Sequence, residues 1–179
     1  MGIGLAACDG APRTTAPDEA LFQSESAAAP PKLPAPAAET RDELMALAAT
    51  GSIRRLARRA EAEPVFLSNF GGADHLRHWD LMRRIGFDPS VNLAAVLSEP
   101  HASQQVGAQT WFVWPDLAVS APRAIEAGAL SSVERARLLA LIGADGVAAM
   151  EAGAPYPGVR TAISETGAWR YFLHEPPDP

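Results

Sequence analysis

The clearest pattern of apolar and polar positions lies in the last regular segment, residues 158–174. Two runs rich in β-branched and aromatic residues flank a short polar segment that ends in Gly167, which is typical of a β-hairpin. If residues 165–167 form a three-residue loop with Gly167 in the left-handed conformation, Ile163 faces Trp169 and the pairs continue outward. A two-residue loop would mix apolar and charged side chains on each face. The three-residue loop predicts a core side made of Val159, Ile163, Trp169, Tyr171 and Leu173.

The same register predicts that Arg160, Arg170 and His174 share the outer face of the hairpin, near Phe172. Guanidinium groups offer paired donors that suit a carboxylate or a phosphate. These three residues are therefore the candidate ligand-binding residues, with an anionic ligand as the expected partner. The alternative, which is the more common arrangement, is that they pair with acidic side chains of a covering helix.

A second strand is predicted over residues 109–114, where both faces are apolar. Such a strand is typically covered on both sides, and Pro115 ends it because proline cannot donate to the ladder. Trp111 and Trp114 are expected in the core, although exposed indoles could also stack on sugar rings. The polar residues 101–107 that precede this strand are predicted to form a loop.

Apolar residues at helical spacing predict several short helices between these strands. Side chains that cap helix N-termini mark their starts, namely Thr40, Asp74, Asp88 before Pro89, and Ser131 with Glu134 in a capping box. Residues 117–130 are predicted to be a loop or a short helix, and Gly143 is predicted to separate two helices. The sequence therefore predicts an α+β fold over residues 39–175, in which a small antiparallel sheet packs with several short helices.

Four arginines gather in the predicted helix around residues 53–61, namely Arg54, Arg55, Arg58 and Arg59. A basic helical surface can bind anionic lipid or another polyanion. Glu61 and Glu63 follow at once, however, and neighbouring turns are acidic. We therefore predict a solvated helix face with i,i+4 ion pairs.

Composition narrows the class of protein. The 179 residues suit one domain plus a tail, and the 47% hydrophobic content is that of a globular chain. No run approaches the roughly 18 apolar residues of a membrane-spanning helix. The formal net charge is -6 and no basic block is present, so nucleic acid is not an expected partner.

The N-terminal region points to the bacterial envelope. Residues 9–38 are rich in Ala, Pro, Ser and Thr, which predicts a disordered tether. Leu5-Ala6-Ala7-Cys8 precedes this tether, contains the single cysteine, and resembles a bacterial lipobox. The resemblance implies that residues 1–8 are the remnant of a signal peptide and that Cys8 carries the lipid. Only residues 1–4 precede the box, which is too short for the usual basic start and apolar stretch. Either the true start of the protein lies upstream of Met1, or the match to a lipobox is accidental.

The second half resembles a group of uncharacterised bacterial envelope proteins. The shared features are the V-W-P motif at residues 113–115 and a closing hairpin with Gly158, Arg160, Gly167, Trp169 and Phe172 at matching positions. Val159 stands where the group has an aromatic residue. The resemblance implies a common fold unit and no particular chemistry.

Candidate catalytic and metal-binding residues are few. His75 and His78 lie three apart on a predicted helix, but zinc needs three or four ligands, and His101 or His174 would complete a set only if the fold brought them in. We predict exposed histidines, no metal site and no cofactor. A hydrolase would need a pocket that unites residues such as His101, Ser103, His75 or Asp74.

The sequence thus favours a lipid-anchored bacterial envelope protein that faces the periplasm and acts as a non-enzymatic binding or structural domain. Its expected partners are the membrane, through the lipid on Cys8, and an anionic ligand or another envelope protein. The alternative is an envelope hydrolase that acts on cell-wall material.

Overall fold

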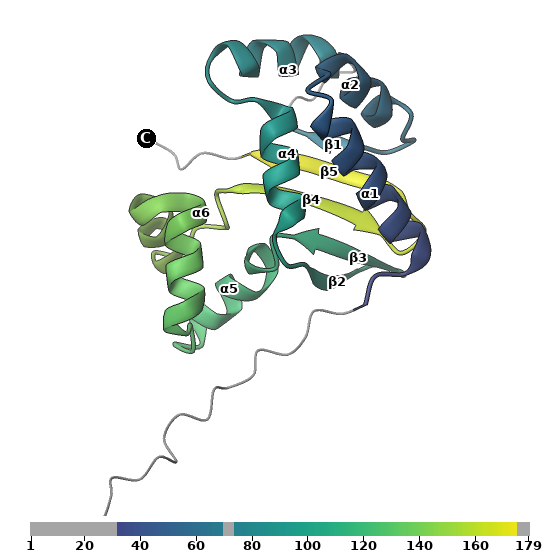
Figure 1. The fold of residues 1–179 in the computed structure, drawn as a ribbon. Helices are drawn as coiled ribbons and strands as arrows, with labels where there is room; N and C mark the ends of the chain where they lie inside the picture. The colour runs from purple at the N-terminus through teal and green to yellow at the C-terminus, as the bar shows by residue number, and fades with distance from the viewer. Residues whose placement is uncertain (1–31, 70–73, 175–179) are drawn as a thin grey trace, which may run out of the picture.

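A five-stranded sheet lies at the centre of the structure, and helices pack against it (Figure 1). This computed structural model describes residues 32–69 and 74–174. The helices are α1 (Ala35–Ala49), α2 (Ile53–Glu61), α3 (His75–Arg84), α4 (Pro89–Ser98), α5 (Leu117–Glu126) and α6 (Ser132–Glu151). The strands are β1 (Leu67–Ser68), β2 (Ala102–Val106), β3 (Gln109–Trp114), β4 (Val159–Ser164) and β5 (Trp169–His174). The predicted α+β class is confirmed. The predicted signal-peptide remnant (residues 1–8, with Cys8) lies outside the described residues, as do residues 9–31 of the predicted tether.

The strand order is β1-β5-β4-β3-β2, with β1 parallel to β5 and the other pairs antiparallel. The strand predicted at 109–114 is β3, and it lies beside the hairpin. The loop predicted at 101–107 was wrong, because residues Ala102–Val106 form the edge strand β2. An edge strand with exposed Ser103, Gln104 and Gln105 carries no alternation of apolar residues, so only its pairing with β3 reveals it.

The hairpin has the predicted three-residue loop, with Gly167 at φ 86° and Ile163 opposite Trp169. Beyond that pair a bulge shifts the register, so that Thr161 faces Phe172 and not Tyr171. The extra residue is Arg170, and an unpaired extra residue turns every later side chain to the other face.

The predicted core side is therefore wrong for Tyr171 and Leu173, since Phe172 joins Val159, Ile163 and Trp169 in the core beneath the helices. Tyr171 packs on the opposite face against the half-buried Trp111, with ring centroids 6.2 Å apart. Trp114 lies in the core as predicted. The bulge places the apolar Phe172 in the core and leaves the Tyr171 hydroxyl outside it.

Helix α1 begins earlier than predicted. Thr40 was the predicted N-cap, but the helix starts at Ala35 with Pro34 at the N-cap position, inside the predicted 9–38 tether. Thr40 is instead buried within α1, and its hydroxyl donates to the carbonyl oxygen of Gly167 at 2.7 Å. The sequence pattern missed this start because the first turn of α1 packs against the hairpin loop, a contact between distant residues.

The other helix starts follow their caps. Asp74 accepts from the Arg77 N–H, Asp88 from the N–H groups of Ser90 and Val91, and Ser131 forms the capping box with Glu134. Residues 117–130 contain a regular helix, α5. Element α6 consists of two helical segments that meet at Gly143, whose backbone is not helical (φ 70°, ψ 179°), as the sequence predicted.

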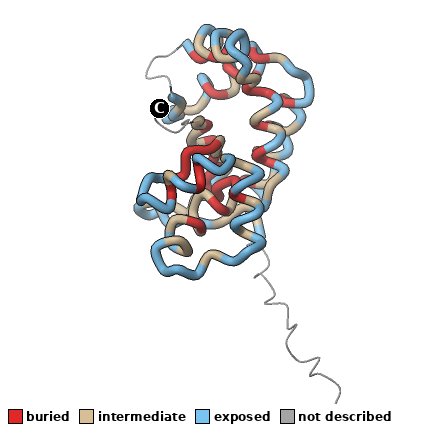
Figure 2. The backbone as a smooth tube through the Cα atoms, turned by 90° about the vertical axis from the view of Figure 1, so that its left-hand side faces the viewer, coloured by how far each residue is buried: buried red, intermediate tan, exposed pale blue. Residues whose placement is uncertain are grey.

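The helices form two groups around two hydrophobic cores. Helices α1 to α4 cover one face of the sheet, and their apolar residues join those of β3, β4 and β5 in the main core. A smaller core joins α5 and α6 through Leu117, Ala121, Leu138, Val147, Met150 and Tyr156. Figure 2 shows that buried residues concentrate inside both groups while their outer turns are exposed. The segment from Tyr156 to Val159 leads from the second core to the first.

Candidate functional site

The three residues predicted to bind an anionic ligand are not brought together. Arg160 faces Leu173 across the hairpin and its Nη1 donates to the Tyr156 carbonyl oxygen at 2.7 Å. Arg170 lies at the bulge, and its side chain contacts Trp111 and Gln109 of β3. His174 faces Val159, on the helix-covered side of the sheet. The prediction that all three share one face was wrong for His174, because the bulge at Arg170 reverses the orientation of the residues that follow it.

Each of these residues is held by local contacts. The Arg170 Nη2 donates to Gln109 Oε1 at 2.6 Å, and its guanidinium carbon lies 5.5 Å from the centre of the Trp111 ring, a cation–π distance. Its Nε is buried and has no hydrogen-bond partner within the described residues. The ring of His174 stacks on Phe87 with centroids 4.5 Å apart.

The residues that a hydrolase would need also lie far apart. His75 is near Ser68 of β1, with its Nδ1 3.3 Å from the Ser68 Oγ, whereas Ser103 is in β2 and His101 packs on Trp114. Strands β1 and β2 are the two edges of the sheet. With neighbouring strands about 4.8 Å apart, the two edges are separated by roughly 19 Å.

His75 is not the exposed helical histidine that the sequence predicted. It is buried beside Phe66 and Trp79, with ring centroids 5.2 and 5.5 Å away, and this burial lowers its pKa. His78 is half-buried on the same helix. Over residues 32–69 and 74–174, no three His, Cys, Asp or Glu side chains are grouped as metal ligands.

A groove between α4 and α6 is a candidate ligand site. It has two compartments of about 190 and 270 Å³, which share Asn92, Leu141 and Val159 and are therefore continuous. Helix α4 supplies one wall with Ala95 and Val96, helix α6 supplies the other, and the start of β4 supplies the floor. The groove follows the boundary between the two cores, where ligand sites often form.

Gly158 allows close packing at the floor of the groove. A Cβ atom at Gly158 would lie 2.5 Å from the Tyr156 hydroxyl oxygen and 2.6 Å from Cγ2 of Ile142. Both distances are far below van der Waals contact, so only glycine allows the Tyr156 ring and α6 to approach the strand this closely.

The groove combines apolar walls with a few polar atoms. Tyr156 lines the groove, and burial raises its pKa to about 12. The hydroxyl is therefore protonated at neutral pH and available as a donor. Asn92 uses its Nδ2 to bond the Asp88 carbonyl oxygen, which leaves its Oδ1 as an acceptor.

The one carboxylate of the groove, Glu99, is held by Arg137. The Arg137 Nη2 donates to Glu99 Oε2 at 2.9 Å and to Asp116 Oδ1 at 2.8 Å, and its Nη1 donates to Asp116 Oδ2 at 3.1 Å. These bonds, those to Asp116 above all, raise the pKa of Arg137. Because one arginine is shared by two carboxylates, the rim keeps a single net negative charge, whereas the other side chains that line the groove are uncharged.

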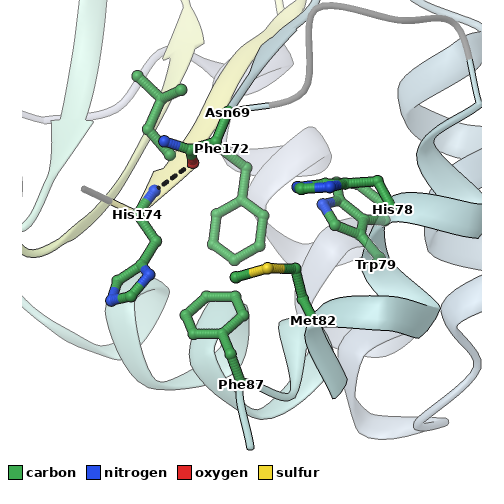
Figure 3. A pocket seen from close by; sticks show the side chains of 8 residues that line it. Asn69, His78, Trp79, Met82, Phe87, Phe172 and His174 are labelled. Carbon is green, nitrogen blue, oxygen red and sulfur yellow. Dashed lines mark hydrogen bonds between the residues drawn. The ribbon is translucent and has the colours of Figure 1, made fainter. Parts of the chain in front are cut away.

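His174 closes the other end of the groove and also lines a narrow crevice on its far side (Figure 3). The crevice holds about 10 Å³ and lies among His78, Trp79, Met82, Phe87 and Phe172. The His174 backbone N–H donates to Asn69 Oδ1 at 2.7 Å. Its Nδ1 is buried without a partner within the described residues, and burial lowers its pKa, so the imidazole is neutral at pH 7.

No pattern in the sequence indicates this groove. Its shared residues Asn92, Leu141 and Val159 come from three separate elements, and each is unremarkable in its own segment. Comparison with protein-family models, with curated proteins and with solved structures found no match to this chain. The resemblances to a lipobox and to an envelope-protein group therefore remain expectations. Within the described residues, no helix is both long and apolar enough to span a membrane.

Proposed function

We propose that this chain is a lipid-anchored bacterial envelope protein, exposed to the periplasm, whose α+β domain binds a small neutral ligand in the groove between α4 and α6. The anchor is supported by Leu5-Ala6-Ala7-Cys8 and the Ala/Pro-rich segment behind it. The groove is the observation that carries the binding function. The domain acts as a receptor or carrier, without a catalytic step of its own.

The lining of the groove supports a neutral ligand with an apolar face. Ala95, Val96, Leu141 and Val159 offer apolar surface on both walls and the floor. A protonated Tyr156 hydroxyl and the Asn92 Oδ1 offer one donor and one acceptor, and a few such groups fix the orientation of a ligand. A charged ligand would lose hydration inside the groove, and Glu99 and Arg137 at the rim are already engaged in ion pairs.

Binding can be tested with N-phenyl-1-naphthylamine, a neutral apolar dye that fluoresces when shielded from water. We expect saturable enhancement with the full chain at one dye per protein. Ala140 lines the groove and is exposed, so Ala140→Trp should fill the groove and weaken binding at least about tenfold. Ala148 is exposed on the same helix and is not among the lining residues, so Ala148→Trp is the matched control.

Two outcomes contradict the groove as the site. The first is an absence of saturable binding to the unmodified chain. The second is equally tight binding by Ala140→Trp and Ala148→Trp, which would place the dye elsewhere.

The anchor needs its own test, because it is independent of the groove. The protein is expressed from its native gene in a bacterium, the membrane fraction is collected, and the N-terminal peptide is weighed by mass spectrometry. We expect a diacylglyceryl group on Cys8 and release of a Cys8→Ser variant from the membrane fraction. An unmodified Cys8, or a Cys8→Ser variant that stays with the membrane, would refute the anchor.

A further inference from the structure

The charge of this protein is distributed very unevenly. Helices α2 and α3 contain seven of the 15 basic residues and only two of the 21 acidic ones. The rest of the chain is left with eight basic and 19 acidic residues. The two helices lie side by side at the end of the molecule away from α5 (Figure 1). A strongly basic end therefore stands on a chain whose net charge is -6.

The arginines of α2 are mostly not paired. The sequence predicted i,i+4 ion pairs, but only Arg59 forms one, with Glu63 at 2.6 Å, and it also bonds Glu43 at 3.0 Å. Arg54, Arg55 and Arg58 are exposed and have no carboxylate partner within the described residues. At 3.6 residues per turn these three fall within an arc of about 100°. Glu61 is the only acidic residue of the helix and lies at the edge of that arc.

Helix α3 extends the same surface. Arg54 of α2 and Arg77 of α3 line one open depression of about 340 Å³ together with Leu76, Asp74 and Asp80. The two carboxylates there are already engaged, because Asp74 caps α3 and Asp80 bonds Arg83 and Arg84. Arg77 is exposed and has no ion-pair partner within residues 32–69 and 74–174.

Two large aliphatic side chains stand among these arginines. Leu81 of α3 is 58% exposed, and Ile85, the residue that follows the helix, is 70% exposed. The buried side of that helix carries His75 and Trp79, so helical geometry places Leu81 beside Arg77 and Arg84 on the outer side. Exposed apolar residues next to arginines are the pattern of helices that rest on a lipid surface.

We propose that this basic end, formed by Arg54, Arg55, Arg58, Arg77, Leu81 and Ile85, docks on a membrane surface that contains anionic phospholipid. The arginines approach the lipid phosphates, and Leu81 and Ile85 enter the boundary between headgroups and acyl chains. A free phosphate would use the arginines alone and gives no reason for the two exposed aliphatic residues. The proposal does not depend on Cys8, since the surface is part of the folded domain.

The test uses the full unlipidated chain and sedimentation with two kinds of vesicle. One kind is phosphatidylcholine alone, and the other contains about one third phosphatidylglycerol. We expect binding to the anionic vesicles that weakens as salt is added. Each arginine near an anionic surface raises the binding constant about fivefold. Arg54→Gln/Arg55→Gln/Arg58→Gln should therefore reduce binding about a hundredfold.

The apolar contribution is measured with Leu81→Ser/Ile85→Ser. This variant should still bind the anionic vesicles at low salt, and it should dissociate from them at moderate salt. Val133→Ser is the apolar control, because Val133 is 69% exposed on α6. Arg123→Gln/Arg135→Gln is the charge control on α5 and α6. Urea unfolding midpoints confirm that every variant is folded.

Three results would overturn the proposal. The first is equal binding to neutral and anionic vesicles. The second is an Arg54→Gln/Arg55→Gln/Arg58→Gln variant that binds as tightly as the controls. The third is release from the vesicles by inorganic phosphate at constant ionic strength, together with an unchanged Leu81→Ser/Ile85→Ser variant, which would identify a phosphate site.

Discussion

The Glu63 carboxylate accepts a hydrogen bond from the backbone N–H of Trp169 at 2.9 Å, across 106 residues of sequence. The same oxygen accepts from Arg59 Nη1 at 2.6 Å, and the Glu63 side chain is only 7% exposed. Trp169 is the first residue of β5, beyond the end of the two-residue strand β1. Glu63 thus takes the place of a missing strand neighbour and connects the end of α2 to the sheet.

Loss of this carboxylate should destabilise the fold. Glu63→Ala leaves the Trp169 N–H and Arg59 without their acceptor, and bonds to charged groups contribute about 1.5–3 kcal/mol. We expect the free energy of unfolding in urea to fall by about 2–3 kcal/mol. Glu43 bonds the same arginine but is 49% exposed, so Glu43→Ala should cost less than about 1 kcal/mol. Equal losses for the two variants would contradict this role of Glu63.

A buried hydrogen bond inside the hairpin offers a second test. The Trp169 indole N–H donates to Thr161 Oγ1 at 2.8 Å, and that hydroxyl donates to the Tyr171 carbonyl oxygen at 2.7 Å. Thr161→Val keeps the shape but leaves the indole N–H unpaired, at an expected cost of about 1–3 kcal/mol. Thr161→Ser keeps the hydroxyl and should unfold at a higher urea concentration than Thr161→Val. The reverse order would show that the methyl group matters more than the hydrogen bond.

Replacing Gly167 by alanine should destabilise the fold more than replacing Gly107, although both glycines have positive φ. A Cβ atom at Gly167 (φ 86°) would lie 2.9 Å from the Pro36 carbonyl oxygen, whereas one at Gly107 (φ 60°) would meet nothing within 4 Å. Both alanine variants pay about 1 kcal/mol for the left-handed conformation. Gly167→Ala should lose roughly 1–3 kcal/mol more, because α1 must move away from the hairpin loop. Thermal unfolding of the two variants measures the difference, and equal losses would exclude the clash.

The stability of the domain should fall in mild acid. Burial lowers the pKa values of His75, His78 and His174 below the ordinary value of 6.5. As the pH falls from about 7.5 to 5.5, the unfolded chain binds protons that the folded chain does not. The free energy of unfolding therefore has its full value above pH 7 and decreases as the pH falls through this window. The window lies above the pH range in which carboxylates titrate.

His75→Gln should reduce that pH dependence, because it removes one of the three titrating groups. Urea midpoints of both proteins at pH 7.5 and 5.5 provide the measurement. A midpoint that does not change with pH in the unmodified chain would show that the histidines titrate alike in the folded and unfolded states.

The sequence by itself determined the features that depend on neighbouring residues. Asp74, Asp88 and Ser131 cap helices at the predicted positions, since a cap bonds the N–H groups of the next turn. Gly167 has the left-handed conformation that the three-residue loop requires. The α+β class follows from the periods of the apolar residues, which are also local.

Only the tertiary structure decided the features that depend on distant residues. The early start of α1 rests on the hairpin loop, and β2 exists because β3 pairs with it. The bulge at Arg170 separates Arg160 from His174, and no local pattern distinguishes the two registers beyond Trp169. The groove unites Asn92, Leu141 and Val159 from three elements. Glu63, just beyond α2, bonds Trp169 of the sheet as well as Arg59, a connection that the spacing of charges along one helix does not contain.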